Sequence, residues 1–523
     1  MKALDWLKSV FSKTDSPPVP VQRVYSAAQP SRLTSGWVTA TSSADTEIRS
    51  SLTNLRARSR ALTRDSAYAK RARVVVVNNV IGGGMGLQAQ VKSTRNRLMT
   101  KVNTSIEEVW KRWNRAEFCH TGGGLHFSDL ERALMSEVFE AGEVFIRMHR
   151  QPFGGSDVPF ALELIESERV PHGIHPHVVG SANEIRMGIE VDPYYRPIAY
   201  WVRDRHPSDF HYPAGQSRYS SEEIRRIPAN EMIHLRVVER WPQTRGIPWL
   251  HAVARKLNDM DGYSEAELVA ARGAANYLGS YDSADPLDMG AEKQEDGTFE
   301  TEIAPGIILR PPPGKKFSFF TPNRPNSALD PFMRYMLREV AAGTGVSYES
   351  LSRDYSQSNY SSSRLALLDD RDLWRVLQMW FIRAFRDEVH RAWLQQAVLA
   401  RAIPGVAVQE YATNREKFES VKYKPRGWSW VDPTKEVTAF KEAIKAGLTT
   451  RTKVIAATGG GDDIEDVDEE REQELQNAKE KGLKFDTDPE AYEQKQPAAA
   501  KPAEPDPADE DPEDEDRPMR VVK

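Results

Sequence analysis

The sequence predicts an α+β protein of several domains in which helices predominate. Long amphipathic segments, with apolar residues at helical spacing, occupy 246–284 and most of 330–400. Short apolar or alternating segments separated by Pro, Gly and Asp are concentrated in 144–240, which is typical of a small antiparallel β unit. The length of 523 residues exceeds one ordinary domain, so we expect about two to four compact units.

Composition narrows the class of protein. Hydrophobic residues at 39% and charged residues at 28% are typical of a soluble globular protein. No apolar run approaches the ~20 residues of a membrane span. Cys119 is the only cysteine, which excludes an intrachain disulfide and indicates a reducing compartment. A net charge of −5 argues against extensive binding of nucleic acid, which depends on clustered Lys and Arg. A mildly acidic protein can still surround DNA without binding it tightly.

The N-terminal part is predicted to be an arm followed by helices. Residues 1–45 form the arm: a short amphipathic segment, which we interpret as a docking helix rather than a secretory signal, precedes Ser-, Thr- and Pro-rich chain. A helix is expected over 46–72. Its arginines favour a solvated helix face or an intersubunit ion-pair surface over a nucleic-acid patch: Arg49, Arg56, Arg58, Arg60, Arg64, Arg71 and, just beyond it, Arg73. Further helices are predicted at 106–115 and 127–140, the second with Ser128 as N-cap and Glu131 completing a capping box.

Several motifs suggest ligands, and each has a plainer explanation. The glycines at 82–86 are not followed by Lys-Ser/Thr, so they indicate a turn before a strand at 87–91 and no phosphate cradle. Three imidazoles, His172, His175 and His177, could bind zinc, but no acidic partner lies at ligand spacing and the Pro and Gly indicate a loop. Metalloprotease, serine-hydrolase and paired-cysteine signatures are absent. We therefore expect no metal, no cofactor and no catalytic residue.

The longest helix is predicted over 248–281, with Pro248 in its first turn. At ~1.5 Å per residue this helix would be roughly 50 Å long, more than one compact core requires. Two short strands at 306–310 and 316–320 follow, and then a helix at 330–343 ended by Gly343 and Gly345. Apolar residues repeat along the first helix about every 3.5 positions, which predicts a packing seam or, more simply, a core helix of a bundle. The seam residues are Leu250, Val253, Leu257, Met260 and Leu268.

A polar, exposed loop is predicted between 345 and 362, before a long helix over 362–400. The candidate functional residues of this loop are Ser352, Arg353, Asp354, Tyr355, Ser356, Gln357, Ser358, Asn359, Tyr360, Ser361 and Arg364. The nearby acids Asp369, Asp370 and Asp372 suggest a metal site. Because neighbouring helix positions point apart, a solvated or intersubunit ion-pair face is the better interpretation.

The segment AAGTGVSYESLSRDYSQSNYSSSR resembles the corresponding stretch of lambda-type bacteriophage portal proteins. Ten of its positions match the family pattern: Gly345, Ser347, Tyr348, Glu349, Leu351, Ser352, Tyr355, Tyr360, Ser361 and Arg364. Family-like residues also occur elsewhere, at Tyr68, Ala69, Val80, Ile81, Gly82, Thr244 to Gly246, Trp430, Asp432, Pro433, Glu436, Ala443, Gly447 and Leu448. The resemblance extends from about Thr63 to Lys481.

The resemblance implies a division of the chain into the regions of a portal subunit. These are a wing at 46–245, a stem helix at 246–284, a clip at 285–328, a returning stem helix at 329–350, a tunnel loop and long tunnel helix at 351–400, and a crown or outer wing at 401–484. The N-terminal arm, 1–45, and an acidic tail at 485–523 lie outside the resemblance, and the composition of the tail predicts disorder.

The resemblance also implies a function without catalysis. Portal proteins form a dodecameric homo-oligomeric ring at one capsid vertex of the virion, assembled in the host cytoplasm and without a membrane. Double-stranded DNA passes through the channel without sequence specificity during packaging and ejection. Expected partners are the terminase large subunit, the major capsid protein or scaffold, and the neck (head-completion) proteins. The alternatives are a generic helical scaffold or adaptor protein of a phage particle and a packaging enzyme.

Overall fold

The computed structural model describes most of the chain between residues 41 and 485. The described residues are 32, 36, 38–39, 41–95, 97–173, 182–209, 224–276, 279–283, 315–319, 327–357, 359–428, 433–458, 464–483 and 485. The expectations for the arm 1–45, for His175 and His177, for a strand at 306–310, for Trp430 and Asp432 and for the tail after 485 lie wholly or largely outside them. No helix in this part of the chain is long and apolar enough to cross a bilayer.

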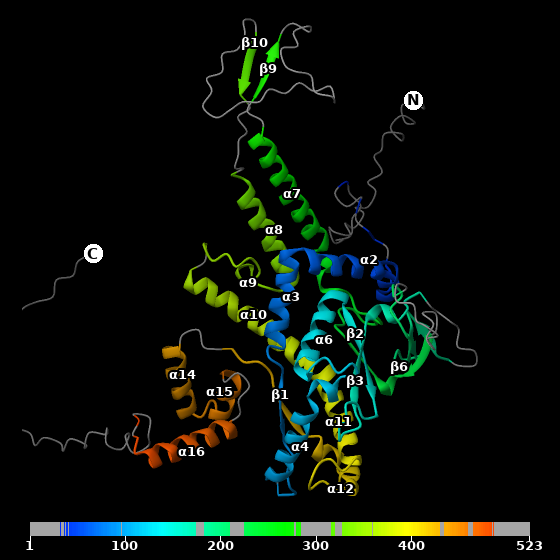
Figure 1. The fold of residues 1–523 in the computed structure, drawn as a ribbon, viewed down its shortest axis with the longest axis vertical. Helices are drawn as coiled ribbons and strands as arrows, with labels where there is room; N and C mark the ends of the chain where they lie inside the picture. Colours follow the sequence, from blue (N-terminus) through cyan, green and yellow to red (C-terminus); the bar gives the residue numbers. More distant parts are fainter. Residues whose placement is uncertain are drawn as a thin grey trace, which may run out of the picture.

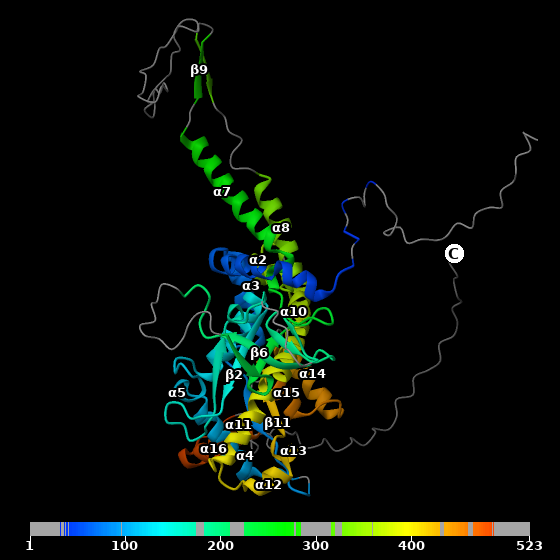
Figure 2. The same cartoon turned by 90° about the vertical axis from the view of Figure 1, so that its right-hand side faces the viewer.

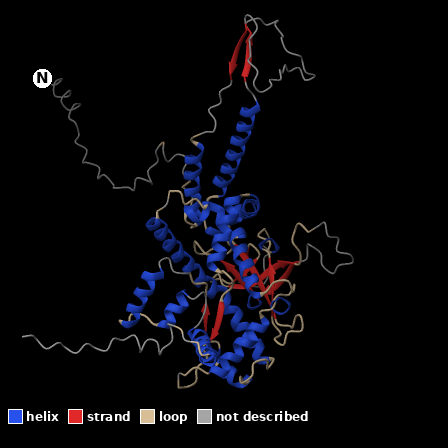
Figure 3. Cartoon of the chain, turned by 60° about the vertical axis from the view of Figure 1, so that its left-hand side comes forward, coloured by secondary structure: helices blue, strands red, loops and turns tan. Residues whose placement is uncertain are grey.

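The molecule is elongated, with a body of helices and small sheets from which two helices project (Figure 1). Helix α7 (Ala254–Asn276) runs outward from the body, and α8 (Leu329–Thr344) returns beside it. At their outer end β9 (Gly279–Ser283) pairs antiparallel with β10 (Lys315–Phe319). Figure 2 shows the same arrangement from the side. The prediction of an α+β fold in which helices predominate is confirmed (Figure 3).

Helices from both halves of the chain build the body. They are α2 (Ala44–Asp65), α3 (Ala67–Val80), α4 (Thr100–Trp113), α5 (Ala116–Cys119), α6 (Phe127–Ala141), α9 (Tyr348–Ser352), α10 (Tyr360–Phe381), α11 (Asp387–Leu399), α12 (Val408–Thr413) and α13 (Arg415–Phe418). One large apolar core, which includes Trp113, Phe139, Phe381 and Trp393, joins them. A two-stranded sheet, β1 (Gly86–Ala89) with β11 (Val421–Lys424), ties the N-terminal half to the chain beyond α13.

The β unit consists of two antiparallel sheets that face each other. One has the order β3 (Ala161–Ile165), β2 (Glu143–His149), β8 (Met232–Arg236). The other has the order β4 (Glu184–Arg186), β5 (Ile189–Val191), β6 (Pro197–Arg203), β7 (Ile224–Pro228). Phe145 and Met232 of the first sheet share a buried apolar cluster with Tyr200 and Ile227 of the second. The small antiparallel β unit predicted within 144–240 is therefore present, but the sequence did not indicate that it has two layers.

A smaller helical unit follows β11, formed by α14 (Pro433–Lys445), α15 (Arg451–Thr458) and α16 (Ile464–Lys481). It lies at the side of the body (Figure 1). Its contacts with the body include Arg364 of α10, which lies 3.6 Å from Glu436, and Gln88 of β1, which donates a hydrogen bond to Glu465.

The structure corrects several predicted boundaries. The helix expected at 106–115 is α4, which begins six residues earlier, at Thr100. The helix expected over 46–72 is two helices, because the chain bends at Ser66 and α3 continues to Val80. The helix expected over 248–281 begins with a 3-10 turn (Trp249–Ala252), so α7 has 23 residues and is roughly 35 Å long at ~1.5 Å each, and β9 replaces its predicted end. Gly343 lies inside α8, and only Gly345, at φ +68°, ends it.

The predicted capping box of α6 is wrong. His126 is the N-cap, and its ring accepts the backbone N–H of Ser128. Glu131 is buried and bonds to residues distant in the sequence, so it does not return to the start of its own helix. The Glu131 carboxylate, which the capping box would require, is instead paired with Arg386.

Candidate functional site

The predicted polar loop is shorter than its sequence suggested. Ser347 to Ser352 include the short helix α9, which ends where Arg353 adopts a left-handed conformation at φ +59°. The exposed connection is therefore 353–359, of which Ser358 lies outside the described residues. Tyr360 and Ser361 begin α10, and Arg364 lies in its first turns, beside Glu436 of α14. The structure thus divides the candidate residues among the end of α9, a loop and the start of α10.

Asp354 organises the loop. Its carboxylate accepts the Tyr348 hydroxyl at 2.9 Å and the Ser356 backbone N–H at 3.0 Å, and Arg334 of α8 lies 3.7 Å away. Hydrogen bonds from the side chain and backbone of Ser356 and from Tyr348 lower the pKa of Asp354 to about 2, so it stays ionised at neutral pH. Arg353, Tyr355, Ser356 and Gln357 remain exposed around it. The loop therefore presents hydroxyl, amide and phenol groups with locally balanced charge.

The start of α10 is held by a capping box that was not predicted from the sequence. Ser362 N–H donates to the Asn359 side chain at 2.8 Å, and Asn359 N–H donates to Ser362 Oγ at 3.1 Å. The signal was present, because Asn at an N-cap with a polar residue three positions later is the usual pattern of a helix start. This reciprocal pair explains why α10 begins two residues earlier than predicted.

Asp370 anchors the other end of the loop region. Its carboxylate accepts the Ser347 N–H at 3.0 Å and the Ser347 hydroxyl at 2.6 Å, which fixes the start of α9 against α10. Burial raises the pKa of Asp370, against the opposing effect of the hydrogen bonds from Ser347. Asp369 and Asp372 are on the exposed side of the helix, and Asp372 pairs with Arg375. Within the described residues no group of three or more His, Cys, Asp or Glu is placed to hold a metal ion.

The seam residues lie at the base of the projecting pair. Leu250, Val253, Leu257 and Met260 are buried in the core of their own chain, near Leu337 and Val340 of α8. Gly343 permits this close packing, because a Cβ there would lie 2.3 Å from Val253. Leu268, further out on α7, is half exposed. The first four residues therefore support the helix pair from within, and Leu268 faces outward.

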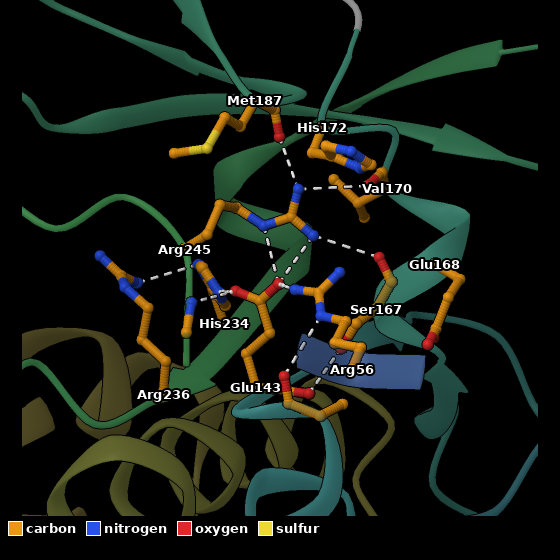
Figure 4. A network of polar contacts seen from close by, with 12 residues as sticks. Arg56, Glu143, Ser167, Glu168, Val170, His172, Met187, His234, Arg236 and Arg245 are labelled. Carbon is orange, nitrogen blue, oxygen red and sulfur yellow. Dashed lines mark hydrogen bonds and ion pairs between the residues drawn. The ribbon is translucent and has the colours of Figure 1, made fainter. Parts of the chain in front are cut away.

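The polar network centred on Glu143 was not found from the sequence (Figure 4). Glu143 Oε1 accepts Arg245 Nε at 2.7 Å and also bonds Arg56. Its Oε2 accepts His234 Nε2 at 2.8 Å and the Gly246 N–H at 2.7 Å. Burial alone would raise the pKa of Glu143, but Arg245 and Arg56 outweigh burial and hold it well below its usual range. One carboxylate thus joins α2, β2, β8 and the chain leading to α7.

Arg245 extends this network to the second sheet. Its guanidinium donates to the carbonyls of Ser167, Val170 and Met187 at 2.6 to 3.1 Å (Figure 4). The adjoining chain approaches closely: Gly142, at φ +87°, leaves no space for a Cβ, which would lie 2.2 Å from the Ile247 backbone. The Thr244 to Gly246 match to the portal family in the sequence therefore marks the junction between the β unit and the projecting helices.

The arginines of α2 and α3 mainly form ion pairs within the chain. Arg60 bonds both Glu137 and Glu168, and Arg73 bonds Glu140. Arg71 donates to the Ser350 carbonyl, which ties α3 to α9. Arg49 and Arg58 are exposed. Most of these arginines are therefore neither solvated nor free for another subunit, because they bond to groups of their own chain. His172, one of the three imidazoles considered as zinc ligands, forms a hydrogen bond with Thr53 of α2 at 2.9 Å.

Comparisons with known proteins support the resemblance to portal proteins that was found in the sequence. The model of the phage portal proteins of the lambda family matches residues 30–378. A probable portal protein of Halomonas phage phiHAP-1 is 28% identical over 489 residues, which cover 90% of this chain and 91% of that protein. Portal protein B of Escherichia phage lambda is 22% identical over 479 residues, covering 86% and 88%.

Among solved structures, the neck of a native gene transfer agent particle, computed with C12 symmetry, covers 76% of this chain and 93% of its own. Its sequence identity is 12% and its TM-score is 0.40, and a likeness at this level carries no functional conclusion. The family match, by contrast, spans well over half of the sequence. This protein therefore belongs to the lambda family of phage portal proteins.

Proposed function

We propose that copies of this chain form a ring, the dodecamer that the family resemblance implies, at one vertex of a phage capsid, and that double-stranded DNA passes through its centre during packaging and ejection. The observation that carries the proposal is the family match over 30–378, which includes the loop 353–359 and both projecting helices. In this proposal α7 and α8 are the stem, β9 and β10 belong to the clip, and the two facing sheets belong to the wing. Helices α14 to α16 belong to the crown or outer wing.

The loop at 353–359 is proposed to face the DNA. DNA that slides through a channel should not bind it strongly through its phosphates, because each phosphate contact adds binding free energy that must be overcome before the DNA can move. The exposed Ser356 and Gln357 provide hydrogen-bonding groups without charge, and ionised Asp354 offsets Arg353. The caps formed by Asp370 and Asn359 hold both ends of the loop.

The ring is proposed to be a docking platform without catalytic activity. The terminase large subunit would dock during packaging, neck proteins would follow, and the major capsid protein or scaffold would surround the ring. The enzyme alternative would need free, convergent carboxylates. Asp370 instead binds Ser347, while Asp369 and Asp372 point away from it on the exposed side of α10.

Packaging by procapsids that contain variant rings tests this function. Ser356→Lys would add one cation per subunit around the duplex, so DNA packaged per procapsid should fall, and more at low salt than at high salt. Gln409→Lys, at an exposed position of α12, is the matched control and should package normally. Gel filtration and negative-stain images check ring formation separately.

Two outcomes would contradict different parts of the proposal. Normal rings whose packaging is unchanged at every salt concentration would place the loop outside the channel. Wild-type protein that stays monomeric at micromolar concentration would overturn the ring itself.

A further inference from the structure

One face of α10 exposes a stripe of large apolar side chains. Its opposite face is anchored in the core by Trp374, Leu377 and Phe381. Leu365 and Val376 are 70% and 65% exposed, respectively. At about 100° per residue the exposed apolar residues gather on one side of the helix. This α10 stripe consists of Leu365, Leu368, Leu373, Val376 and Met379.

The α10 stripe also carries acidic groups. Asp369 and Asp372 lie among its apolar residues and are exposed. Asp372 is paired with Arg375 at 2.8 Å, whereas Asp369 forms no ion pair with any residue that the structure describes. Contiguous apolar surface of this kind marks an interaction site, and an unpaired carboxylate within it favours a partner that supplies a cation.

A second exposed patch lies in the β unit and has the complementary chemistry. It is centred on Trp241 and includes the exposed residues Tyr194, Ile198 and Val238, which are close in sequence to the residues that line one small hollow; we call it the Trp241 patch. Trp241 lines this hollow together with Tyr195 and Pro197, which brings the turn before β6 beside the chain after β8. Two exposed arginines belong to the same region. Arg240 bonds Ser42 and Glu47 at the start of α2, and Arg196 forms no ion pair within the described part of the chain.

The two surfaces are on opposite sides of the molecule. In Figure 1, α10 projects to the left, while β6 and the N-terminal end of α2 lie to the right at a similar height along the long axis. In Figure 2 the start of α2 comes toward the viewer and α10 lies behind it. A head-to-tail ring requires two different surfaces placed in this way on every subunit.

We infer that the α10 stripe of one copy packs against the Trp241 patch of the next copy around the ring. The aliphatic stripe would cover Trp241 and Tyr194, residue types that dominate interface cores, and Asp369 would meet Arg196. This inference rests on the proposed ring and goes beyond it by naming the two surfaces that meet. It also gives the exposed acids of α10 a role between subunits.

Cross-linking tests the contact directly. The double variant Val376→Cys with Ile198→Cys, treated with a short bismaleimide, should give a ladder of covalent oligomers, because each subunit then carries both halves of the contact. Each single variant alone should stay monomeric on denaturing gels, and a mixture of the two should give dimers only. Cys119 is fully buried, so it contributes little background. Leu399→Cys with Ile198→Cys is the control, because Leu399 is an exposed residue near the end of α11, away from the stripe.

Charge exchange is the second, independent test. Asp369→Arg and Arg196→Asp should each weaken ring formation roughly tenfold at fixed protein concentration, because like charges would face each other across the interface. The two substitutions together should restore the ring fraction to that of the wild type. Glu388→Arg on α11 is the control for charge reversal alone and should leave ring formation unchanged.

The outcomes separate this inference from the function on which it rests. Rings whose double-cysteine variant gives no ladder, or charge exchange without recovery, would overturn the inferred contact and leave the ring intact. Cross-linking of Val376→Cys to itself would show that two stripes meet, which also overturns it. Absence of rings in the wild type would overturn the proposed function itself.

Discussion

Replacing Glu143 by Gln should strongly destabilise the protein. All four groups around the carboxylate are donors: Arg245, Arg56, His234 and the Gly246 N–H. Gln offers one acceptor oxygen and one NH2 group, so its amide would place a donor against donors at one side or the other. It would also leave Arg245 and Arg56, which are 0% and 4% exposed, without an anion.

The expected loss follows from these contacts. Removing one partner of a buried ion pair costs about 3–5 kcal/mol, because the remaining charge stays buried. At about 1.4 kcal/mol per tenfold change, this lowers the folding equilibrium constant by roughly two to four orders of magnitude. The control is Glu388→Gln, whose exposed pair with Arg391 should contribute less than about 1 kcal/mol.

Urea unfolding followed by circular dichroism would measure both variants at one protein concentration. The pH dependence gives a second readout. Because the pKa of Glu143 is depressed in the folded state, its stabilisation is complete above the unfolded pKa of about 4.3 and is lost as pH falls further. Glu143→Gln should therefore lose less stability than the wild type below pH 4. A loss of less than about 1 kcal/mol at pH 7 would refute the argued role of this carboxylate.

Two further substitutions test other buried groups. Burial and the nearby Arg386 lower the pKa of His390 to about 3. Between the unfolded pKa of about 6.5 and this folded value the unfolded chain binds more protons, so stability decreases as the pH is lowered. His390→Phe should keep the stability at pH 7 and lose up to about 1.4 kcal/mol less per pH unit in urea titrations from pH 6 to 4, and an unchanged slope would contradict this. Asp370→Ala should cost about 1–3 kcal/mol and speed hydrogen exchange at the amides of α9, because Ser347 loses its acceptor. Asp372→Ala, which removes only an exposed pair, should change exchange there little, and equal effects of the two would argue against the cap.

The parts of the fold that depend on local pattern were predictable from the sequence. The apolar spacing of 330–400 predicted α8 and the long helical stretch of α10 and α11, and short apolar or alternating segments predicted the β unit within 144–240. Gly345 was correctly placed as a helix end, since a left-handed residue there needs no Cβ. These features arise from neighbours along the chain, which a single sequence contains.

Features set by distant residues were not predictable. Glu131 fits a capping box locally, yet it bonds Arg386, which is far away in the sequence. The predicted end of the 248–281 helix becomes β9 because β10, beyond a long intervening segment, pairs with it. The Glu143 network likewise joins residues from four separate segments. In each case the sequence contains many residues or segments that could be the partner, and only the fold determines which of them are in contact.

The candidate loop was located from its family pattern and polar composition, and the structure shortened it to 353–359. Helix α9 was missed because five residues give too little periodicity to identify a helix. The interpretation of Asp370 as part of a solvated or intersubunit ion-pair face was wrong, because its carboxylate is buried and accepts hydrogen bonds from Ser347, a contact that only the fold creates.

Helices α10 and α11 form one rod, because the residues between them, Ile382–Arg386, make a π-helical turn and no break. Val389, Trp393 and Ala397 of α11 are enclosed by the core, whereas α10 is anchored along one face only and its other side is open. A wider turn shifts the angular phase of the residues that follow it, so each half can direct its own apolar side chains into the body. Each half of the rod therefore rests on the body through its own apolar face, and Arg386, which pairs with Glu131, ties the turn between them to α6.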